Sequence, residues 1–196
     1  MIRTKLTASL VCAGLVMAPL HAGAKGLSYS YAEIGYSNLD ADSAEADGVT
    51  ARISFAPLDF LHVKGEYSRL FVDDITGTSD DDVDYDRFVI GIGGNYSVTD
   101  NIDVLGTVSY VDAEFTGDFK ESEEGYQVEA GARAMVGKKA ELNAGVIYLD
   151  AGDFDDTGFG VGAVFKLKKK FALSANARAF DEDDQVEFFV GLRLNF

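Results

Sequence analysis

The sequence predicts an all-β protein: a transmembrane up-and-down antiparallel β-barrel of about ten strands, after a cleaved signal peptide. Apolar and polar residues alternate through segments of roughly ten residues, as expected for strands with one apolar and one polar face. Short turns and longer acidic loops separate these segments in strict alternation. No apolar run reaches the roughly 20 residues of a membrane helix, so strands closed into a barrel are the way for this chain to cross a bilayer.

The N-terminal residues predict export. Met1–Lys5 carries two basic residues, Leu6–Leu20 is an apolar run, and Ala22–Ala24 forms a small-x-small cleavage site. We therefore expect residues 1–24 to be a secretory signal peptide and residues 25–196 to be the barrel domain. The alternative is an N-terminal membrane anchor, for which the apolar run is too short.

Composition limits the possible functions. The cleaved chain would hold about 170 residues, enough for one domain, and no cysteine, because Cys12 lies in the signal peptide. Disulfides, thiol catalysis and cysteine-metal sites are therefore excluded. The formal net charge of −16 also excludes nucleic acid as a partner, since phosphate binding needs a basic surface.

The first five strands are expected between Ser28 and Tyr110, with turns at Pro57–Asp59 and Thr99–Asn101. The outward face of the fifth strand is ambiguous, because Leu105 lies in its otherwise polar row. The expected apolar rows are Ala32, Ile34, Tyr36; Val49, Ala51, Ile53, Phe55; Leu61, Val63, Tyr67; Phe88, Ile90, Ile92, Gly94, Tyr96; and Val104, Gly106, Val108, Tyr110.

The last five strands follow the same scheme, with lysine-rich turns at Gly137–Lys139 and Lys168–Lys170. An even number of strands returns both chain ends to the same side, as in bacterial single-chain barrels; eight strands is the alternative count. The expected apolar rows are Tyr126, Val128, Ala130, Ala132, Ala134; Leu142, Ala144, Val146, Tyr148; Phe159, Val161, Ala163, Phe165; Phe171, Leu173, Ala175, Ala177; and Phe188, Val190, Leu192, Leu194, Phe196.

A secreted soluble barrel, with the apolar row inside, would show the same alternation. The polar rows favour the membrane barrel, because they carry charges of both signs on most strands: Glu33, Arg52, Lys64, Glu66, Arg87, Glu129, Arg133, Glu141, Lys166, Arg178, Glu187 and Arg193. Unpaired charges would be costly in a narrow lumen, so we expect ion pairs across neighbouring strands that plug it. The alternative is a narrow channel, for which inward glycines would leave space: Gly91, Gly93, Gly158, Gly160 and Gly162.

The longer loops are almost purely acidic, and a solvated surface is the simplest interpretation. A second hypothesis is Ca²⁺ or Mg²⁺ binding at Asp80–Asp84 and Asp153–Asp156, because hard cations prefer carboxylate oxygens and bridge the phosphates of lipopolysaccharide. Neither segment fits an EF-hand loop.

We expect no enzymatic activity and no cofactor. The expected mature chain has one histidine, His62, which follows the Pro57 turn, and a lone histidine there is more typical of an interior hydrogen-bonding residue than of a catalytic base. No phosphate-binding glycine loop and no histidines at metal-ligand spacing occur.

The apolar row Phe188, Val190, Leu192, Leu194 and Phe196 resembles the C-terminal strand of bacterial outer-membrane barrels. That resemblance implies that the strand closes the barrel, ends in the periplasm and is bound by the barrel-assembly machinery. The whole expected mature chain resembles small barrels of the OmpA/Opa-like superfamily. Leu27–Tyr31, Val128–Arg133 and Phe189–Arg193 are similar to a short ten-stranded branch from plant-associated and environmental proteobacteria.

This resemblance implies location in the cell outer membrane, in contact with its lipid and lipopolysaccharide. The expected function is a structural or surface-interaction role with the lumen plugged by ion pairs. The alternative is a porin-like diffusion channel, cation-preferring because its mouth is acidic.

Overall fold

The computed structural model describes residues 24, 26–41, 44–75, 83–117, 120–152, 154–181 and 185–196, and its regular elements are all strands. No helix in this part of the chain is long and apolar enough to cross a membrane. The ten strands are β1 (Tyr31–Ala41), β2 (Ala44–Leu58), β3 (Leu61–Ile75), β4 (Val83–Thr99), β5 (Ile102–Thr116), β6 (Lys120–Val136), β7 (Ala140–Ala151), β8 (Phe154–Lys166), β9 (Phe171–Phe180) and β10 (Val186–Asn195).

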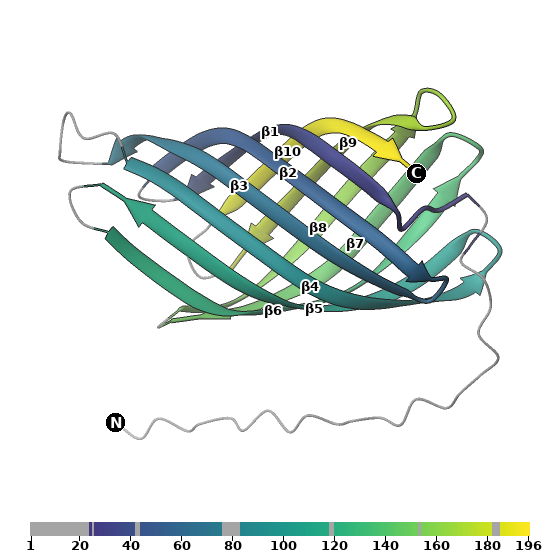
Figure 1. Cartoon of the computed structure of the whole chain (residues 1–196), viewed down its shortest axis with the longest axis horizontal. Coiled ribbons are helices and arrows are strands. Elements are labelled where there is room, and N and C mark those ends of the chain that lie inside the picture. The colour runs from purple at the N-terminus through teal and green to yellow at the C-terminus, as the bar shows by residue number, and fades with distance from the viewer. Residues whose placement is uncertain are drawn as a thin grey trace, which may run out of the picture.

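Each strand pairs antiparallel with the next, and β10 pairs with β1, so the sheet closes into a barrel (Figure 1). The closing seam runs from Tyr31↔Asn195 to Asp40↔Val186 without a register shift. The predicted all-β barrel is therefore confirmed, with ten strands rather than eight. We call the end that holds the turns after β2, β4, β6 and β8, together with Phe196, the turn end, and the opposite end the loop end.

The apolar rows face outward, as predicted. Ile34 is 59% exposed, Ile92 54% and Val190 59%, whereas polar residues at the alternate strand positions, such as Glu33, Ser37 and Thr50, are buried. A soluble barrel would show the reverse, because its apolar row would fill the core. In β5 the ambiguity is resolved: Val108 points out and Thr107 points into the lumen.

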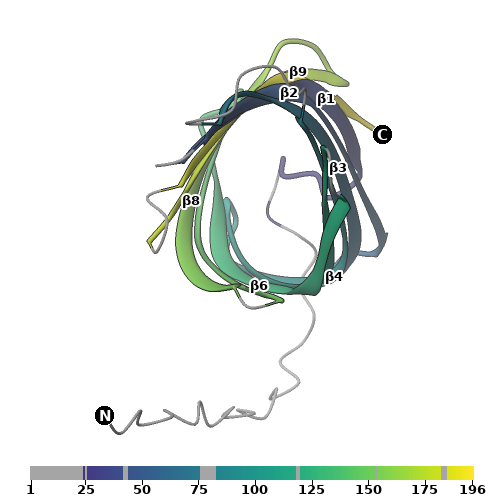
Figure 2. The same ribbon diagram turned by 90° about the vertical axis from the view of Figure 1, so that its left-hand side faces the viewer.

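The chain before β1 differs from the expectation of a first strand that starts at Ser28. Pairing begins only at Tyr31, and Tyr29 is buried. Figure 2, along the barrel, shows this part of the chain (purple) inside the barrel outline. The expected signal peptide up to Gly23 lies outside the described residues, and so do Asp80–Asp82 and Asp153 of the acidic loops.

Candidate functional site: the barrel lumen

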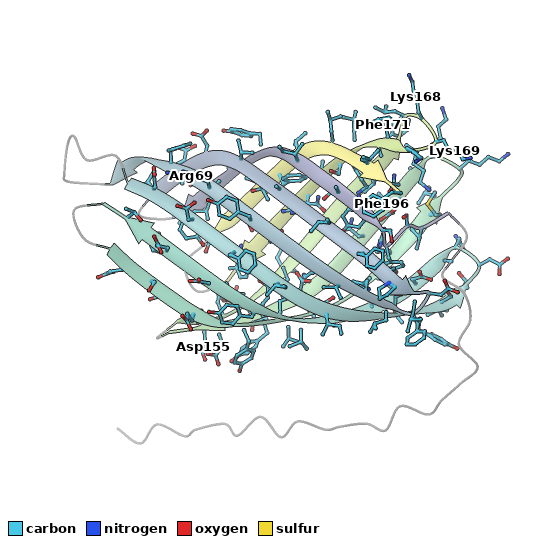
Figure 3. All side chains as sticks on the ribbon, viewed as in Figure 1. Arg69, Asp155, Lys168, Lys169, Phe171 and Phe196 are labelled. Carbon is cyan, nitrogen blue, oxygen red and sulfur yellow. The ribbon has the colours of Figure 1, made fainter. Side chains whose placement is uncertain are left out.

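The polar rows of the ten strands line the lumen, and most of the charged side chains among them are buried or half-buried. Figure 3 labels Lys168, Lys169 and Phe196 at one end of the barrel, with Arg69 and Asp155 toward the other. Eleven of the twelve charged residues expected in the lumen are buried or half-buried there and form ion pairs: Glu33, Arg52, Lys64, Glu66, Arg87, Glu129, Arg133, Glu141, Arg178, Glu187 and Arg193. The twelfth, Lys166, donates to the Gly26 carbonyl oxygen instead. The eleven paired residues form two networks at different depths.

The central network is built around two glutamates. Glu66 on β3 accepts from Arg52 Nε at 2.7 Å and from Arg178 at 3.3 Å. Glu187 on β10 also pairs with Arg178, at 3.3 Å, and with Arg87 at 3.5 Å. Arg178 therefore joins both carboxylates, and the guanidinium of Arg52 stacks on the inward ring of Phe189 at 4.0 Å.

The same network continues toward β6 through a neutral side chain. Arg87 donates to Gln127 Oε1 at 2.9 Å, and Gln127 Nε2 donates to Glu129 at 2.9 Å. Glu129 then pairs with Lys64 on β3. Gln127 is 1% exposed and connects two charged groups, although its uncharged side chain did not mark it in the sequence.

The turn-end network lies closer to the turns. Arg193 on β10 pairs with Glu33 on β1 at 2.6 Å and with Glu141 on β7 at 3.8 Å, and its guanidinium stacks on Tyr31 at 3.9 Å. Glu141 also pairs with Arg133 at 2.7 Å. Glu33, Glu141, Arg133 and Arg193 are all buried, so their mutual pairing compensates charges that are shielded from water.

The expectation of ion pairs across neighbouring strands needs correction. Arg193–Glu33, Arg52–Glu66 and Arg133–Glu141 do join neighbours. However, Arg178–Glu66 joins β9 to β3, Arg87–Glu187 joins β4 to β10, and Lys64–Glu129 joins β3 to β6. These pairs cross the lumen, because a barrel only slightly wider than eight strands allows long side chains to meet from opposite walls.

The segment Gly26–Ser30 reaches into the lumen at the turn end. The carbonyl oxygen of Gly26 accepts a hydrogen bond from Lys166, that of Ser28 accepts one from Arg133 at 3.0 Å, and that of Tyr29 accepts one from Ser54 at 2.7 Å. We call this segment the turn-end plug. It reaches inward from the start of β1 and packs against side chains of β2, β6 and β8.

Tyr29 anchors the plug. Its hydroxyl donates to Asp103, a fully buried carboxylate that also accepts from Ser97. The Tyr29 ring lies between two side chains, with the Arg133 guanidinium at 4.3 Å and the His62 ring stacked at 5.1 Å. Ala24 donates its backbone N–H to Asp103, but the expected cleavage would remove that residue and leave the contacts of Tyr29.

His62 is 4% exposed at the turn end, inside the barrel. The stack with Tyr29 is its ring contact, and its Nδ1 has no hydrogen-bond partner among the described residues. The interior position expected from the sequence is thus found, and the Asn95 side chain lies within hydrogen-bonding reach of the imidazole.

A cavity of about 190 Å³ lies in the lumen between the networks and the plug. The inward glycines were expected to leave space, yet neighbours fill four of those positions. A Cβ atom added at Gly91 would lie 2.2 Å from Ser109 Oγ, and one added at Gly93 would lie 2.4 Å from His62 Nε2. At Gly158 it would lie 2.8 Å from Phe180 Cδ1, and at Gly162 it would lie 2.2 Å from Asn176 Oδ1. At Gly160 nothing lies nearer than 3.6 Å, so this glycine opens onto the cavity.

No metal centre is formed by the described residues, among which no group of three or more His, Cys, Asp or Glu could hold an ion. Asp80–Asp82 and Asp153 of the two acidic segments lie outside those residues, whereas Asp84, Asp155 and Asp156 are among them. The apolar row of β10 is placed on the outer surface, where Phe188, Val190, Leu192, Leu194 and Phe196 are all 40–59% exposed.

Solved structures share this architecture at low sequence identity. The NanC porin is 7% identical, with 84% of this chain and 100% of that chain covered and a TM-score of 0.54. The translocator domain of the autotransporter NalP from Neisseria meningitidis is 15% identical, with coverages of 88% and 90% and a TM-score of 0.51. The KdgM porin is 14% identical, with coverages of 84% and 99% and a TM-score of 0.49.

A sequence-family model adds evidence that shape alone does not supply. No curated protein matches the chain. Residues 8–166 match the model described as the outer membrane protein beta-barrel domain, which is well over half of the chain. The OmpA-like small barrel and the outer-membrane location expected from the sequence are thereby confirmed. This chain belongs to the outer membrane protein beta-barrel domain family.

Proposed function

We propose that this protein is an integral outer-membrane barrel with a structural or surface-interaction role, whose lumen is closed rather than conducting. The closing elements are the two ion-pair networks and the turn-end plug. With the turn end in the periplasm, as the terminal strand implies, the plug closes the periplasmic mouth and the loop end faces the cell exterior.

The single observation that carries this proposal is the set of ion pairs that cross the lumen. Arg178–Glu66, Arg87–Glu187 and Lys64–Glu129 join strands three or four places apart around the barrel, which supports a path that is obstructed along the barrel axis. Opening such a path would separate buried charges from their partners, which is costly in a water-poor interior. A narrow barrel with these contacts favours rigidity over transport.

Surface interaction is proposed for the loop end. Carboxylates are frequent among the outward side chains there, and two of them already have partners: Asp84 pairs with Arg69, and Asp150 accepts from Tyr126 at 2.9 Å. We extend this to the hypothesis that Ca²⁺ or Mg²⁺ links the acidic loops to lipopolysaccharide phosphates. If so, EDTA should lower the affinity of the refolded barrel for lipopolysaccharide vesicles, and Mg²⁺ should restore it. Affinity that ignores EDTA would exclude the metal bridge.

A narrow cation-preferring channel is the second candidate. The cavity beside Gly160 favours it, because that cavity provides part of a path through the lumen. The acidic loop end would attract cations to such a path. We further propose that the outward row of β10 is recognised by the barrel-assembly machinery and that the barrel catalyses no reaction.

Planar-bilayer recording of the refolded barrel separates the two candidates. The closed barrel should show no discrete current steps, whereas cation-selective steps from the wild type would refute closure. A variant with Tyr29→Ala and Arg178→Ala should gain steps, because it removes the plug anchor, the Arg178–Glu66 pair across the lumen and the Arg178–Glu187 pair between neighbouring strands. Tyr36→Ala, on the outward face, is the control, and slower migration of boiled protein on a gel verifies that each variant folds.

A further inference from the structure

The cavity in the lumen is lined by unequal numbers of opposite charges. Five cationic side chains and four carboxylates line it: Arg52, Lys64, Arg133, Arg178 and Arg193 against Glu33, Glu66, Glu129 and Glu141. In the turn-end network two arginines match two glutamates. The surplus cation belongs to the central network, which contains four cations and three carboxylates: Arg52, Lys64, Arg87 and Arg178 with Glu66, Glu129 and Glu187.

A surplus charge among buried and half-buried side chains favours a bound counter-ion, because an uncompensated buried charge is costly. Hydrogen-bond donors remain free to bind such a counter-ion. An ammonium group has three donors, and Lys64 uses one of them on Glu129. Arg52 donates its hydrogen bond to Glu66 through Nε at 2.7 Å, and its two terminal nitrogens make no hydrogen bond with the described residues.

The opposite wall of the cavity is neutral and polar. Asn143 on β7 and Asn176 on β9 converge over Gly162, where their amide atoms lie 2.2–2.8 Å from the position of an added Cβ. Both line the cavity. Each amide offers donors and an acceptor, which is the combination that recognises a hydroxyl group. The volume of about 190 Å³ lies below the range for drug-sized ligands, so the occupant must be small.

We propose that this cavity is a binding site for a small monovalent carboxylate that also carries hydroxyl groups. One negative charge matches the one surplus cation, and a planar carboxylate suits a guanidinium, which can donate two parallel hydrogen bonds. Asn143 and Asn176 bind the hydroxyls, and Gly160 leaves the space that the carbon chain fills. Binding of this kind needs no conduction, so the inference goes beyond the closed barrel and stands or falls separately from it.

Calorimetric titration of the refolded barrel in detergent, at constant ionic strength, tests the charge and the hydroxyls together. The probes are gluconate, sorbitol and N-methylglucamine, which share a six-carbon polyol chain and carry one negative charge, none and one positive charge. Gluconate should bind one-to-one and at least tenfold more tightly than sorbitol, and N-methylglucamine should not bind. Side-chain amide NMR signals of Asn143 and Asn176 should shift with gluconate.

Two pairs of variants place the binding in the cavity. Gly160→Leu fills the space and should abolish gluconate binding, while Gly160→Ala, whose Cβ has room, should retain it. Lys64→Gln removes the surplus cation and should weaken binding at least tenfold. Lys138→Gln, which removes the same charge from an exposed turn, should leave it unchanged. Because Gly160→Leu and Lys64→Gln differ in chemistry, a folding failure in one leaves the other informative.

The outcomes that overturn the inference are distinct. Equal affinity for gluconate and sorbitol would show that the negative charge of the ligand does not contribute to binding. Tighter binding of N-methylglucamine than of gluconate would show that the site prefers a cation rather than an anion. No gluconate binding at about 10 mM, where a 1 mM Kd would fill roughly nine-tenths of the sites, would exclude the site itself. Discrete currents from a barrel that still binds gluconate would instead refute the closed lumen and leave the site intact.

Discussion

The Arg193–Glu33 ion pair provides a direct test of how much the lumen contributes to barrel stability. Arg193 and Glu33 are 6% and 5% exposed and pair at 2.6 Å across the seam that closes the barrel. Arg193→Met leaves Glu33 as a buried charge without its partner. Glu141, the second partner of Arg193, retains its ion pair with Arg133 at 2.7 Å. Removing one member of a buried pair costs about 3–5 kcal/mol, so we expect a loss of that size in the free energy of unfolding.

A second variant separates the charge from the packing. Replacing both residues, Glu33→Leu with Arg193→Met, removes both charges and keeps similar side-chain volume, and such replacements of buried pairs are often neutral. The double variant should therefore recover most of the stability that the single variant loses. Lys168→Met, in an exposed turn, is the surface control and should change stability by less than about 0.5 kcal/mol.

The assay is urea unfolding of the refolded barrel in lipid vesicles, followed by the fraction that keeps the fast gel mobility of the unboiled form. Refolding from urea must retrace the same curve before a free energy is taken from it. A cost below about 1 kcal/mol for Arg193→Met would show that water or another group compensates Glu33. A double variant less stable than the single one would show that packing, and not charge, dominates at this position.

Three further predictions concern assembly and the lipid face. Deleting Phe196, which is 55% exposed and donates its N–H to Ser30 O at 3.2 Å, should reduce the amount of heat-resistant barrel in cell membranes; normal amounts would exclude its role in assembly. Ile90→Arg, on the outward face of β4, should cost about 2–4 kcal/mol in vesicles if Ile90 lies near the bilayer midplane, and an unchanged urea midpoint would contradict contact with lipid there. Gly35→Val should impair seam closure, because a Cβ there would lie 2.3 Å from Val190 O; fast-migrating barrel in wild-type yield would refute that close approach.

Much of the architecture was accessible from the residues alone. The alternation in β4, from Phe88 to Tyr96, predicts which side chains meet lipid, because a strand sends successive side chains to opposite faces. β5 was less clear, since Leu105 interrupts its polar row, and only pairing with β4 and β6 decided its faces. The turn-end plug was missed because Ser28–Ser30 alternates like a strand, and nothing local shows that Tyr29 leaves the sheet.

The sequence by itself determined the class and, for every strand except β5, the face presented to the membrane, because the two-residue period and the turns are local properties of the chain. It left eight strands open beside ten, and closure of the sheet decided the count. Only the tertiary structure decided which charges meet. Arg178 and Glu66 are 112 residues apart, and closure of the barrel is what brings β9 and β3 to opposite walls of one narrow lumen. The open space at Gly160 is likewise a tertiary property, because whether a glycine leaves a cavity depends on the side chains that the facing strands direct toward it.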